Sequence, residues 1–302
     1  MTCPFLKETR VKHCDKSALR KMIRIAGNAA QDTCSSPRYK ECEVYRRAPD
    51  NSNELQCPHL RESLAQYCAA SAVMRLIPYS EPMASRCGGD AYRYCDVYLE
   101  AGDAPAQAAA TRRDAAVGGI RIPTRLRYSR NHMWLDADQG GSCHIGVDAF
   151  LTRVLGAVEE VTFLKQTGVH RPSAIFTVRG MDLEVMFPNS IRVTASNLYL
   201  RANPARLTAD PYGMGWLFQG VEVPDRPPVT AGLVRGDEVP RWMESEIARM
   251  SAFLAECWNS RHGAALMNDG GVFSPDVLQH LSHEETLEMF HEFFLGTREA
   301  QA

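Results

Sequence analysis

The sequence predicts an α+β chain of several domains: a duplicated, helical cysteine-rich module, a small β barrel-sandwich, and C-terminal helices. Three observations predict this class. A cysteine pattern repeats within the first 98 residues, short alternating apolar runs follow Pro123, and helical periodicity returns after Pro240. The length of 302 residues and the hydrophobic fraction of 45% suffice for about two domains with cores of their own.

The cysteine-rich module at residues 1–98 consists of two copies, 1–52 and 53–98. Each copy has the spacing C-x10-C, then a longer interval without cysteine, then C-x7-C. Aligning the copies on these cysteines also superimposes other positions, such as Tyr39 on Tyr92. The pattern therefore indicates a tandem duplication. The repeated cysteines are Cys3, Cys14, Cys34, Cys42, Cys57, Cys68, Cys87 and Cys95.

Each copy is expected to be mainly helical. Proline follows Cys3 and Cys57, where it suits the first position of a helix, and Ser17 and Ser71 suit N-caps. An unbroken helix over 3–14 would place its two cysteines about 16 Å apart, which is too far for one metal centre. Either the helix breaks, or ligands come from both copies, or the cysteines pair differently.

Four cysteines per copy, without a histidine at a ligand position, predict an all-thiolate metal site. The sequence shows no export signal or membrane segment, so we expect a cytoplasmic protein whose thiols stay reduced. One or two iron–sulfur clusters, [4Fe-4S], are favoured over zinc, because neither copy has a C-x2-C pair. Two alternatives stay open: a helical hairpin with disulfides Cys3–Cys42 and Cys14–Cys34, and plain buried thiols.

The middle of the chain changes from a linker to strands. Residues 99–126 are rich in Ala, Gly and charged residues and are expected to be a linker. After Pro123, short alternating runs separated by Gly, Pro and Asn predict the strands of a small barrel or sandwich. These runs are 127–129, 133–135, 143–146, 175–178 and 191–193.

Three motifs in this region resemble the glycine cleavage system H protein family. Residues 127–134 read R-Y-S-R-N-H-M-W, like the family's R-Y-[ST]-x-x-H-x-W, and residues 146–150 read G-V-D-A-F, like its G-I-T-D-F. Residues 210–217 read D-P-Y-G-M-G-W-L and differ at one position from the family's D-P-Y-G-E-G-W-L. The resemblance covers residues 127–220 and implies an H-protein-like, lipoyl-type barrel with a hairpin that presents a lipoyl-lysine.

The lysine that the resemblance implies is missing. Alignment on Pro188 puts Gly180 at its position. Alignment on Ala174 puts Asp182 there, and no lysine occurs from residue 166 to the last residue, 302. Lipoate is attached through an amide bond to a lysine amine, so we expect no lipoate and no aminomethyl shuttle.

The last motif is a turn with two interpretations: it docks a partner, or it supports the barrel. Pro, Tyr, Gly and Trp in a tight turn favour support of the fold over docking. The residues of this possible docking turn are Asp210, Pro211, Tyr212, Gly213, Gly215 and Trp216.

Residues 221–302 are expected to form a proline-rich linker and two C-terminal helices. The first helix begins at Pro240, and the second follows a capping box of Ser282 and Glu285. Their apolar faces are Met243, Ile247, Met250 and Leu254 in the first helix, and Leu287, Phe290 and Phe294 in the second.

Together these features predict a non-catalytic, non-lipoylated adaptor or electron-transfer accessory protein with a protein partner in a redox or regulatory complex and no membrane partner. No nucleotide-binding, nucleophile-elbow or zinc-protease motif occurs, so a conventional enzyme is disfavoured. The alternative is a metal- or redox-sensing regulator whose basic module binds nucleic acid or a protein. Residues 1–47 carry 11 Lys/Arg against 5 Asp/Glu, whereas 237–302 carry 4 against 12.

Overall fold

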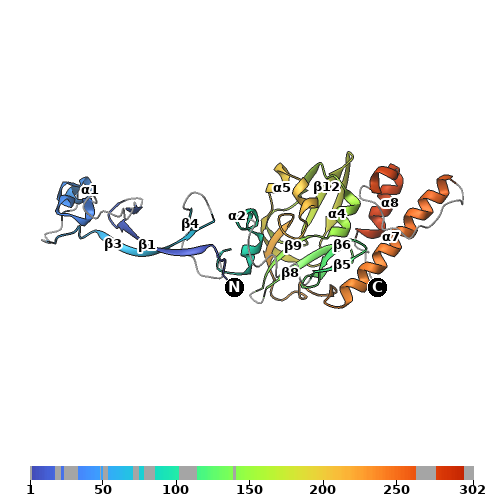
Figure 1. The fold of residues 1–302 in the computed structure, drawn as a ribbon, viewed down its shortest axis with the longest axis horizontal. Helices are drawn as coiled ribbons and strands as arrows, with labels where there is room; N and C mark the ends of the chain where they lie inside the picture. Colours follow the sequence, from blue (N-terminus) through green and yellow to red (C-terminus); the bar gives the residue numbers. More distant parts are fainter. Residues whose placement is uncertain are drawn as a thin grey trace. The chain divides into compact units, whose positions relative to one another are not determined.

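The computed structural model describes residues 2–17, 22–23, 33–47, 49, 54–70, 75–77, 86–101, 114–138, 141–262 and 277–295. Contacts between residues divide the chain into two compact units, Met1–Arg93 and Tyr94–Ala302. Figure 1 labels several elements of both units, and each unit is described by itself.

A long antiparallel pair of strands, β1 (Leu6–Cys14) and β3 (Leu60–Cys68), is the frame of the first unit. Two short strands, β2 (Met22–Ile23) and β4 (Arg75–Ile77), complete a sheet of order β2-β1-β3-β4. The prediction of a helical module was therefore wrong for these segments. β1 and β3 each pair along their whole length with a segment of the other copy, and strand formation of this kind depends on its cross-strand neighbours more than on the local sequence.

Short helices follow in both copies. The first copy continues with η2 (Thr33–Ser35), η3 (Pro37–Glu41) and α1 (Glu43–Arg47). The second copy continues with η4 (Asp90–Tyr94) and α2 (Asp96–Glu100). Of the two serines expected to be N-caps, Ser17 lies in a bend directly after β1, and Ser71 lies outside the described residues.

The register of β1 and β3 is centred on equivalent residues of the two copies. Arg10 lies opposite Leu64, and the two are counterparts when the copies are aligned on Cys3 and Cys57. The last residue of β1, Cys14, consequently lies opposite the first residue of β3, Leu60. Each end of the β1–β3 pair is thus built from the end of one copy's strand and the beginning of the other's.

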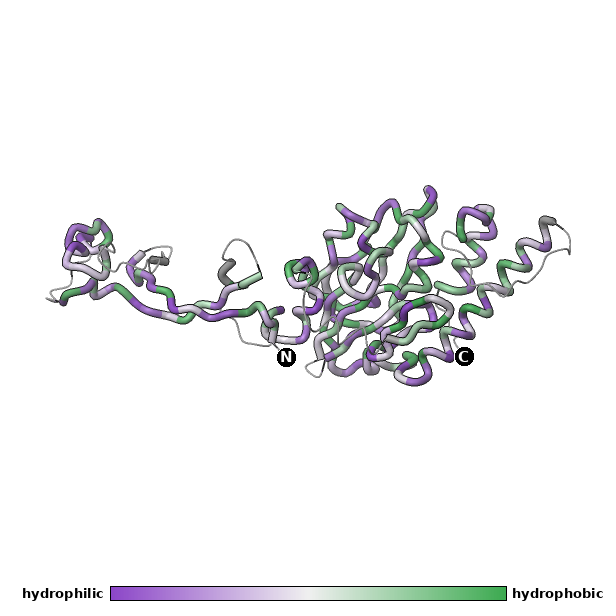
Figure 2. The backbone as a smooth tube through the Cα atoms, viewed as in Figure 1, coloured by the Kyte–Doolittle hydropathy of each residue, from purple (hydrophilic) through white to green (hydrophobic). Residues whose placement is uncertain are grey.

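The first unit buries very little apolar surface. Leu64, in the middle of β3, is 57% exposed, and Figure 2 shows polar residues along much of the pair. Units with so small a core generally depend on crosslinks such as disulfides or bound metal. The buried side chains among the described residues of this unit are Cys3, Tyr39, Tyr45, Cys57 and Tyr92.

Two larger antiparallel sheets and a two-stranded hairpin form the second unit, and the predicted α+β class is confirmed there. The larger sheet has the order β11-β14-β15-β9-β8-β7-β16, and the smaller has the order β10-β12-β13. All five strands predicted from the sequence occur, as β7, β8, β9, β12 and β14. The larger sheet consists of β7 (Arg127–Tyr128), β8 (Met133–Ala137), β9 (Ser142–Val147), β11 (Gly168–His170), β14 (Ile191–Ser196), β15 (Phe218–Val221) and β16 (Val234–Arg235). The smaller consists of β10 (Glu160–Phe163), β12 (Ser173–Val178) and β13 (Met181–Met186), and the short helices are α4 (Ala149–Leu155), α5 (Tyr199–Ala202) and α6 (Ala205–Ala209).

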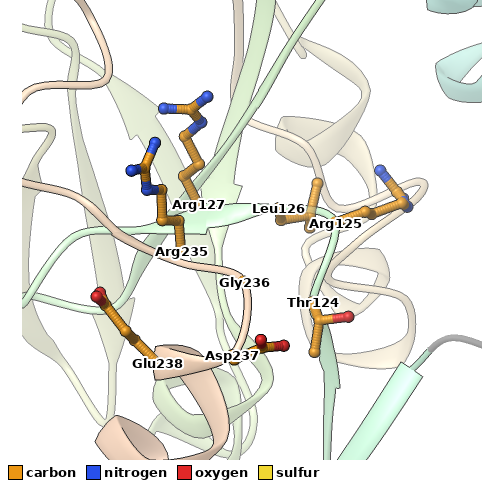
Figure 3. A pocket seen from close by; sticks show the side chains of 8 residues that line it. All are labelled: Thr124, Arg125, Leu126, Arg127, Arg235, Gly236, Asp237 and Glu238. Carbon is orange, nitrogen blue, oxygen red and sulfur yellow. The ribbon is translucent and has the colours of Figure 1, made fainter.

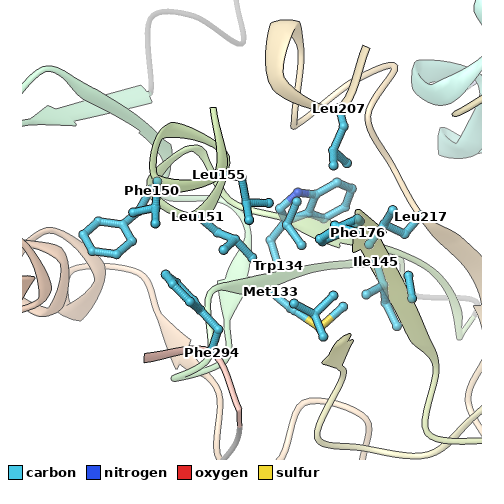
Figure 4. Packing of buried hydrophobic residues seen from close by; sticks show 14 of the residues in the cluster. Met133, Trp134, Ile145, Phe150, Leu151, Leu155, Phe176, Leu207, Leu217 and Phe294 are labelled. Carbon is cyan, nitrogen blue, oxygen red and sulfur yellow. The ribbon is translucent and has the colours of Figure 1, made fainter. Parts of the chain in front are cut away.

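Trp134 in β8 lies at the centre of the core of the second unit. Its side chain is fully buried, and Figure 4 shows it among apolar side chains from the strands and from the helices α4 and α6. In the same view, Phe294 from the end of the described chain points toward Phe150 of α4. The C-terminal segment is therefore part of the same core.

Part of the predicted linker is a hairpin of two strands. β5 (Asp114–Val117) pairs with β6 (Ile120–Pro123), and the side chains of Ile120 and Ile122 are buried in the core. The alternation Ile-Arg-Ile puts both isoleucines on one face of β6, a signal too short to stand out in an Ala-rich stretch. Residues 102–113 of the predicted linker lie outside the described residues.

The two predicted C-terminal helices are confirmed. α7 spans Glu238–His262, and α8 spans His283–Phe293 after the short η5 (Val277–His280). The capping box of Ser282 and Glu285 is present, whereas Leu287, expected on the apolar face, is 45% exposed. None of the helices in the described parts of the chain combines the length and apolarity needed to cross a bilayer.

Candidate functional site

The hairpin for which the resemblance implies a lipoyl-lysine ends in Arg179 and Gly180. These residues form the two-residue turn between β12 and β13, with φ angles of 53° and 71°. Two consecutive positive φ angles are typical of a type I′ turn. Gly180 therefore lies at the tip, and Asp182 lies in β13, where it accepts a hydrogen bond of 2.8 Å from Thr177.

Arg179 binds the C-terminal segment of the chain. Its Nη1 atom donates hydrogen bonds to the carbonyl oxygen of Leu278 and, over 3.4 Å, to that of Leu281. The family's carrier chemistry needs a lysine amine that lipoate can acylate, and this tip offers a guanidinium group bound to carbonyls of the same chain. The residues present do not fit lipoate.

Two glycines allow the predicted docking turn to close. A Cβ atom at Gly213 would lie 2.1 Å from Oδ2 of Asp210, and one at Gly215 would lie 2.8 Å from the carbonyl oxygen of Asp210. The backbone of the turn is held by a hydrogen bond of 2.8 Å from the amide of Gly215 to that same carbonyl. Both glycines are therefore required by close approach of the chain to itself.

The remaining residues of the turn point into the domain. Trp134 Nε1 donates a hydrogen bond of 3.0 Å to the carbonyl of Pro211. The hydroxyl of Tyr212 donates to the carbonyl of Arg121 over 2.9 Å and accepts from the amide of Ala149 over 3.0 Å. Tyr212 and Trp216 are both buried. This geometry agrees with the interpretation that the turn supports the fold.

A buried charged group, which the sequence analysis missed, joins three elements of the domain. Nδ1 of His132 lies 2.8 Å from Oδ2 of Asp148, and Nε2 lies 3.4 Å from Oε2 of Glu246. Burial lowers the pKa of His132, but the two carboxylates outweigh it, so the pKa lies above its usual value. The sequence features that could have revealed this group are the histidine of the motif at 127–134 and the aspartate of the motif at 146–150. The group is enclosed and stabilises the fold.

A hollow of about 400 Å³ lies beside the beginning of α7. Figure 3 shows the guanidinium groups of Arg127 and Arg235 near each other, with the carboxylates of Asp237 and Glu238 on a separate part of the wall. The described residues that line the hollow include no cysteine or histidine. Its lining residues are Thr124, Arg125, Leu126, Arg127, Arg235, Gly236, Asp237 and Glu238.

Four of the predicted cysteine ligands lie at the end of the β1–β3 pair where β1 finishes and β3 begins. We call this the Cys57 end; it contains Cys14, Cys34, Cys42 and Cys57. The amide of Cys57 donates a hydrogen bond of 2.8 Å to the carbonyl of Cys34. Cys34 and Cys42 pack against a small buried cluster of Cys57, Tyr39 and Tyr45. Burial raises the pKa of the Cys57 thiol, and the thiols of Cys14 and Cys42 raise it further.

The opposite end of the β1–β3 pair, the Cys3 end, holds Cys3, Cys68 and Cys87. The amide of Cys3 donates a hydrogen bond of 2.9 Å to the carbonyl of Cys87, and Cys68 is the last residue of β3. Cys95 belongs to the second unit, where it precedes α2. Within the described ranges, no group of three or more His, Cys, Asp or Glu side chains is arranged so that it could hold a metal ion. Metal binding by the eight cysteines therefore stays a prediction.

One disulfide alternative is wrong on geometric grounds. A strand of nine residues such as β1 is about 27 Å long, so it keeps Cys3, which lies in the turn before β1, roughly 20 Å or more from the Cys57 end. A disulfide needs Cα atoms within about 7 Å. Cys3 and Cys42, which lie at opposite ends of the pair, cannot form one without unfolding it.

Comparison with known proteins shows which family the second unit is similar to. A sequence model of the glycine cleavage H-protein family matches residues 126–246. The glycine cleavage system H protein of Aeromonas hydrophila is 29% identical over 101 residues, which is 32% of this chain and 78% of that protein. The H protein of Halorhodospira halophila is 30% identical over 105 residues, which is 33% of this chain and 78% of that protein. The crystal structure of the H protein of Mycobacterium marinum aligns with a TM-score of 0.35 and 20% identity, covering 41% of this chain and 98% of its own. Through this region, the chain belongs to the glycine cleavage H-protein family.

Proposed function

We propose that this chain is a cytoplasmic adaptor of the H-protein family that carries no lipoate and binds metal through its cysteine-rich module. The observation that carries the proposal is the hairpin tip, where Arg179 is bound to carbonyls of Leu278 and Leu281. The domain keeps the barrel of the family without the amine on which its carrier chemistry depends.

An adaptor function follows from what the domain retains. The relatives are named as proteins of the glycine cleavage system, and membership of a system implies protein partners. A barrel without the lipoyl-lysine can still dock on a partner protein. The cysteine-rich unit can then bring a metal centre to that partner. We therefore propose a redox or regulatory protein complex as the setting, with no catalytic step performed by this chain.

Two features support metal binding: the small core of the first unit and the cysteine thiols that it contains. The first unit buries few side chains, and two of them are cysteines. Four thiols collected at one end of a strand pair are the donor set of zinc and of iron–sulfur clusters, and a bound metal would stabilise the unit as a crosslink. Of the two, we favour iron–sulfur, because the module lacks a C-x2-C pair.

The nucleic-acid alternative is disfavoured by ion pairs between the strands. Nζ of Lys12 lies 3.7 Å from Oε1 of Glu62, and Nε of Arg61 lies 2.9 Å from Oδ2 of Asp15. Basic side chains that already face carboxylates contribute little free positive charge to a phosphate backbone. Binding of the full chain to DNA or RNA at low salt, with a steep loss as salt rises, would revive this alternative.

Two measurements test the proposal. The full chain is incubated with lipoate, ATP and a lipoate ligase, beside an ordinary H protein; mass spectrometry is expected to show lipoylation of the ordinary H protein alone. A lipoyl adduct on this chain would overturn the non-lipoylated part.

Metal content is measured on protein purified without oxygen, by elemental analysis and visible absorption. About four or eight irons with visible absorption support iron–sulfur clusters. One or two zinc ions without colour support a structural metal. The absence of both metals, also after reconstitution with iron and sulfide or with zinc, would refute the metal-binding part.

A further inference from the structure

We propose that the cysteines are grouped across the two copies, so that Cys14, Cys34 and Cys42 of the first copy share one four-thiolate metal centre with Cys57 of the second. This inference rests on the proposed metal binding and says which thiols meet.

The length of β1 excludes a centre made by the first copy alone. Cys3 precedes β1 and Cys14 ends it, so the strand of nine residues, about 27 Å long, lies between them. Ligands of a single ion or cubane cluster lie within a few ångströms of one another, with metal–sulfur distances of about 2.3 Å. A centre that includes Cys14 must therefore take its fourth cysteine from elsewhere.

The antiparallel register supplies that cysteine from the second copy. Because Cys14 lies opposite Leu60, the segment that leads into β3 passes the end of β1. The amide of Asp15 donates a hydrogen bond of 3.1 Å to the carbonyl of His59, which ties this segment to the residue after Cys14. Cys57 lies shortly before His59 and Leu60 in the same segment.

Hydrogen bonds also join Cys57 to the helices of the first copy. Its amide donates to the carbonyl of Cys34 over 2.8 Å. The hydroxyl of Tyr39, in η3, donates a hydrogen bond of 3.1 Å to the carbonyl of Glu54. These contacts hold the segment 54–57 against η2 and η3, the helices that hold or precede Cys34 and Cys42. These backbone contacts bring the segments that carry the four cysteines together, and the thiols still have to turn toward one another to hold a metal ion.

The Cys57 end is partly enclosed by aromatic side chains. Cys57 is 6% exposed and packs with the rings of Tyr39 and Tyr45, which lie 4.9 Å apart edge to face. Four thiolates around a divalent ion leave net negative charge. Nζ of Lys12 lies 3.2 Å from Oγ of Ser35, the residue after Cys34, and 3.7 Å from Oε1 of Glu62, so this ammonium group is shared between the Cys57 end and a carboxylate.

The Cys3 end repeats the arrangement in reverse, which argues against chance. The amide of Cys3 donates to the carbonyl of Cys87 over 2.9 Å, as Cys57 does to Cys34. The amide of Ala69 donates to the carbonyl of Phe5 over 2.8 Å, as Asp15 does to His59. In both cases the first cysteine of one copy meets the later cysteines of the other.

The test compares two matched substitutions in the full chain, Cys57→Ser and Cys3→Ser, each of which changes the first cysteine of one copy. The reduced proteins are loaded with Zn²⁺, treated with N-ethylmaleimide and digested, and the labelling of each cysteine is measured by mass spectrometry. Loss even of an outer partner of a metal ligand lowers affinity about 10–100-fold. In Cys57→Ser we expect the labelling rate of Cys14, Cys34 and Cys42 to rise at least about tenfold, with Cys68 and Cys87 still protected.

Cys3→Ser should leave the thiols of the Cys57 end protected and expose Cys68 and Cys87. The opposite result, in which Cys3→Ser exposes Cys14, Cys34 and Cys42, would show centres within each copy and overturn the inference. Equal exposure of all thiols in both variants would also overturn it, because the two ends would then not bind metal independently of each other.

A second measurement on the unmutated chain needs neither metal nor a variant that folds. Brief oxidation with diamide, followed by disulfide mapping, is expected to join Cys57 to thiols of the first copy, Cys14, Cys34 or Cys42. Disulfides between Cys3 and these thiols would refute the grouping. If the unmutated chain gains no protection from Zn²⁺ or iron, the metal centre fails, and the disulfide map then shows whether the grouping of thiols fails with it.

Discussion

Nδ1 of His132 and Oδ2 of Asp148 lie 2.8 Å apart, and both side chains are fully enclosed by the barrel and its C-terminal helices. Nε2 of the same ring faces Oε2 of Glu246 in α7 over 3.4 Å. The ring stacks on Phe150 with centroids 4.2 Å apart. This one side chain therefore links α4 to α7 and couples the family's barrel to the segment that follows it.

The His132 group predicts a specific dependence of stability on pH. The pKa of His132 is raised in the folded state, because the carboxylates of Asp148 and Glu246 outweigh the effect of burial. Its stabilising contribution is complete below the unfolded pKa of about 6.5 and is lost as pH rises through the higher folded pKa. We expect the free energy of unfolding to fall over that interval. Urea unfolding between pH 6 and 9 measures it.

His132→Gln should remove this pH dependence and cost about 3–5 kcal/mol, because it leaves buried carboxylates without their partner. The matched control is His291→Gln, which changes an exposed histidine in α8. We expect the control to change stability by less than about 0.5 kcal/mol. If the decline with pH persists in His132→Gln, another group causes it.

Tyr212 tests whether the motif at 210–217 supports the fold. Its hydroxyl bridges the carbonyl of Arg121 and the amide of Ala149 inside the domain. Tyr212→Phe leaves both groups without this partner and should cost about 1–3 kcal/mol. Tyr199→Phe, at a side chain that is 64% exposed, is the control and should be nearly neutral. The measurement is thermal unfolding of the unmutated chain, Tyr212→Phe and Tyr199→Phe. An unchanged unfolding temperature in Tyr212→Phe would favour the interpretation that this tyrosine serves docking.

The barrel was predictable because its signals are local. Alternating runs such as Ile175-Phe176-Thr177-Val178 fix which face of a strand is buried, and the structure has them as strands. The helix after Pro240 and the capping box at Ser282 are equally local patterns. The family motifs added the order of these elements.

The cysteine module was mispredicted because its structure depends on pairing between the copies. Leu6–Cys14 pairs with the equivalent segment of the second copy, Leu60–Cys68, and neither strand buries a continuous face. Cys-Pro and serine positions then favoured helices. The distance argument against one centre per copy nevertheless holds more strongly for a strand than for a helix, since a strand rises about 3.3 Å per residue rather than 1.5 Å.

At the hairpin, the sequence showed that the lysine is absent, but it did not show which contacts the side chains at the tip make. Two alignments left Gly180 and Asp182 as candidates; Gly180 lies in the turn, and Asp182 lies in β13. The contact of Arg179 with Leu278 joins residues 99 positions apart. No spacing rule predicts such a contact, because it depends on how the C-terminal segment packs.

Arg179→Ala should loosen the C-terminal segment. The substitution removes the guanidinium donor from the carbonyls of Leu278 and Leu281, and the Leu278 carbonyl keeps only a hydrogen bond of 3.4 Å from the amide of Leu281. Loss of a donor to a buried carbonyl costs about 1–3 kcal/mol. We expect faster amide exchange in α8, measured by hydrogen–deuterium exchange and mass spectrometry. Arg192→Ala, at an exposed position in β14, is the control and should leave α8 unchanged. Unchanged exchange in Arg179→Ala would mean that the aromatic contacts of α8 suffice to hold it.

Cys143 should resist alkylation as long as the barrel is folded. It is 1% exposed in β9, and burial, with Asp138 and Glu222 nearby, raises the pKa of its thiol to about 12. At pH 8 almost none of it is thiolate, the form that reacts with iodoacetamide. We expect no labelling of Cys143 over a period that fully labels metal-free Cys14, and complete labelling of both in 6 M urea. Because Cys143 lies outside the cysteine-rich module, it also reports whether Cys57→Ser and Cys3→Ser leave the barrel intact. If Cys143 in the folded protein were labelled as fast as Cys14, the barrel would open readily. The packing of α7 and α8 against the barrel would then not suffice to keep it closed to the reagent.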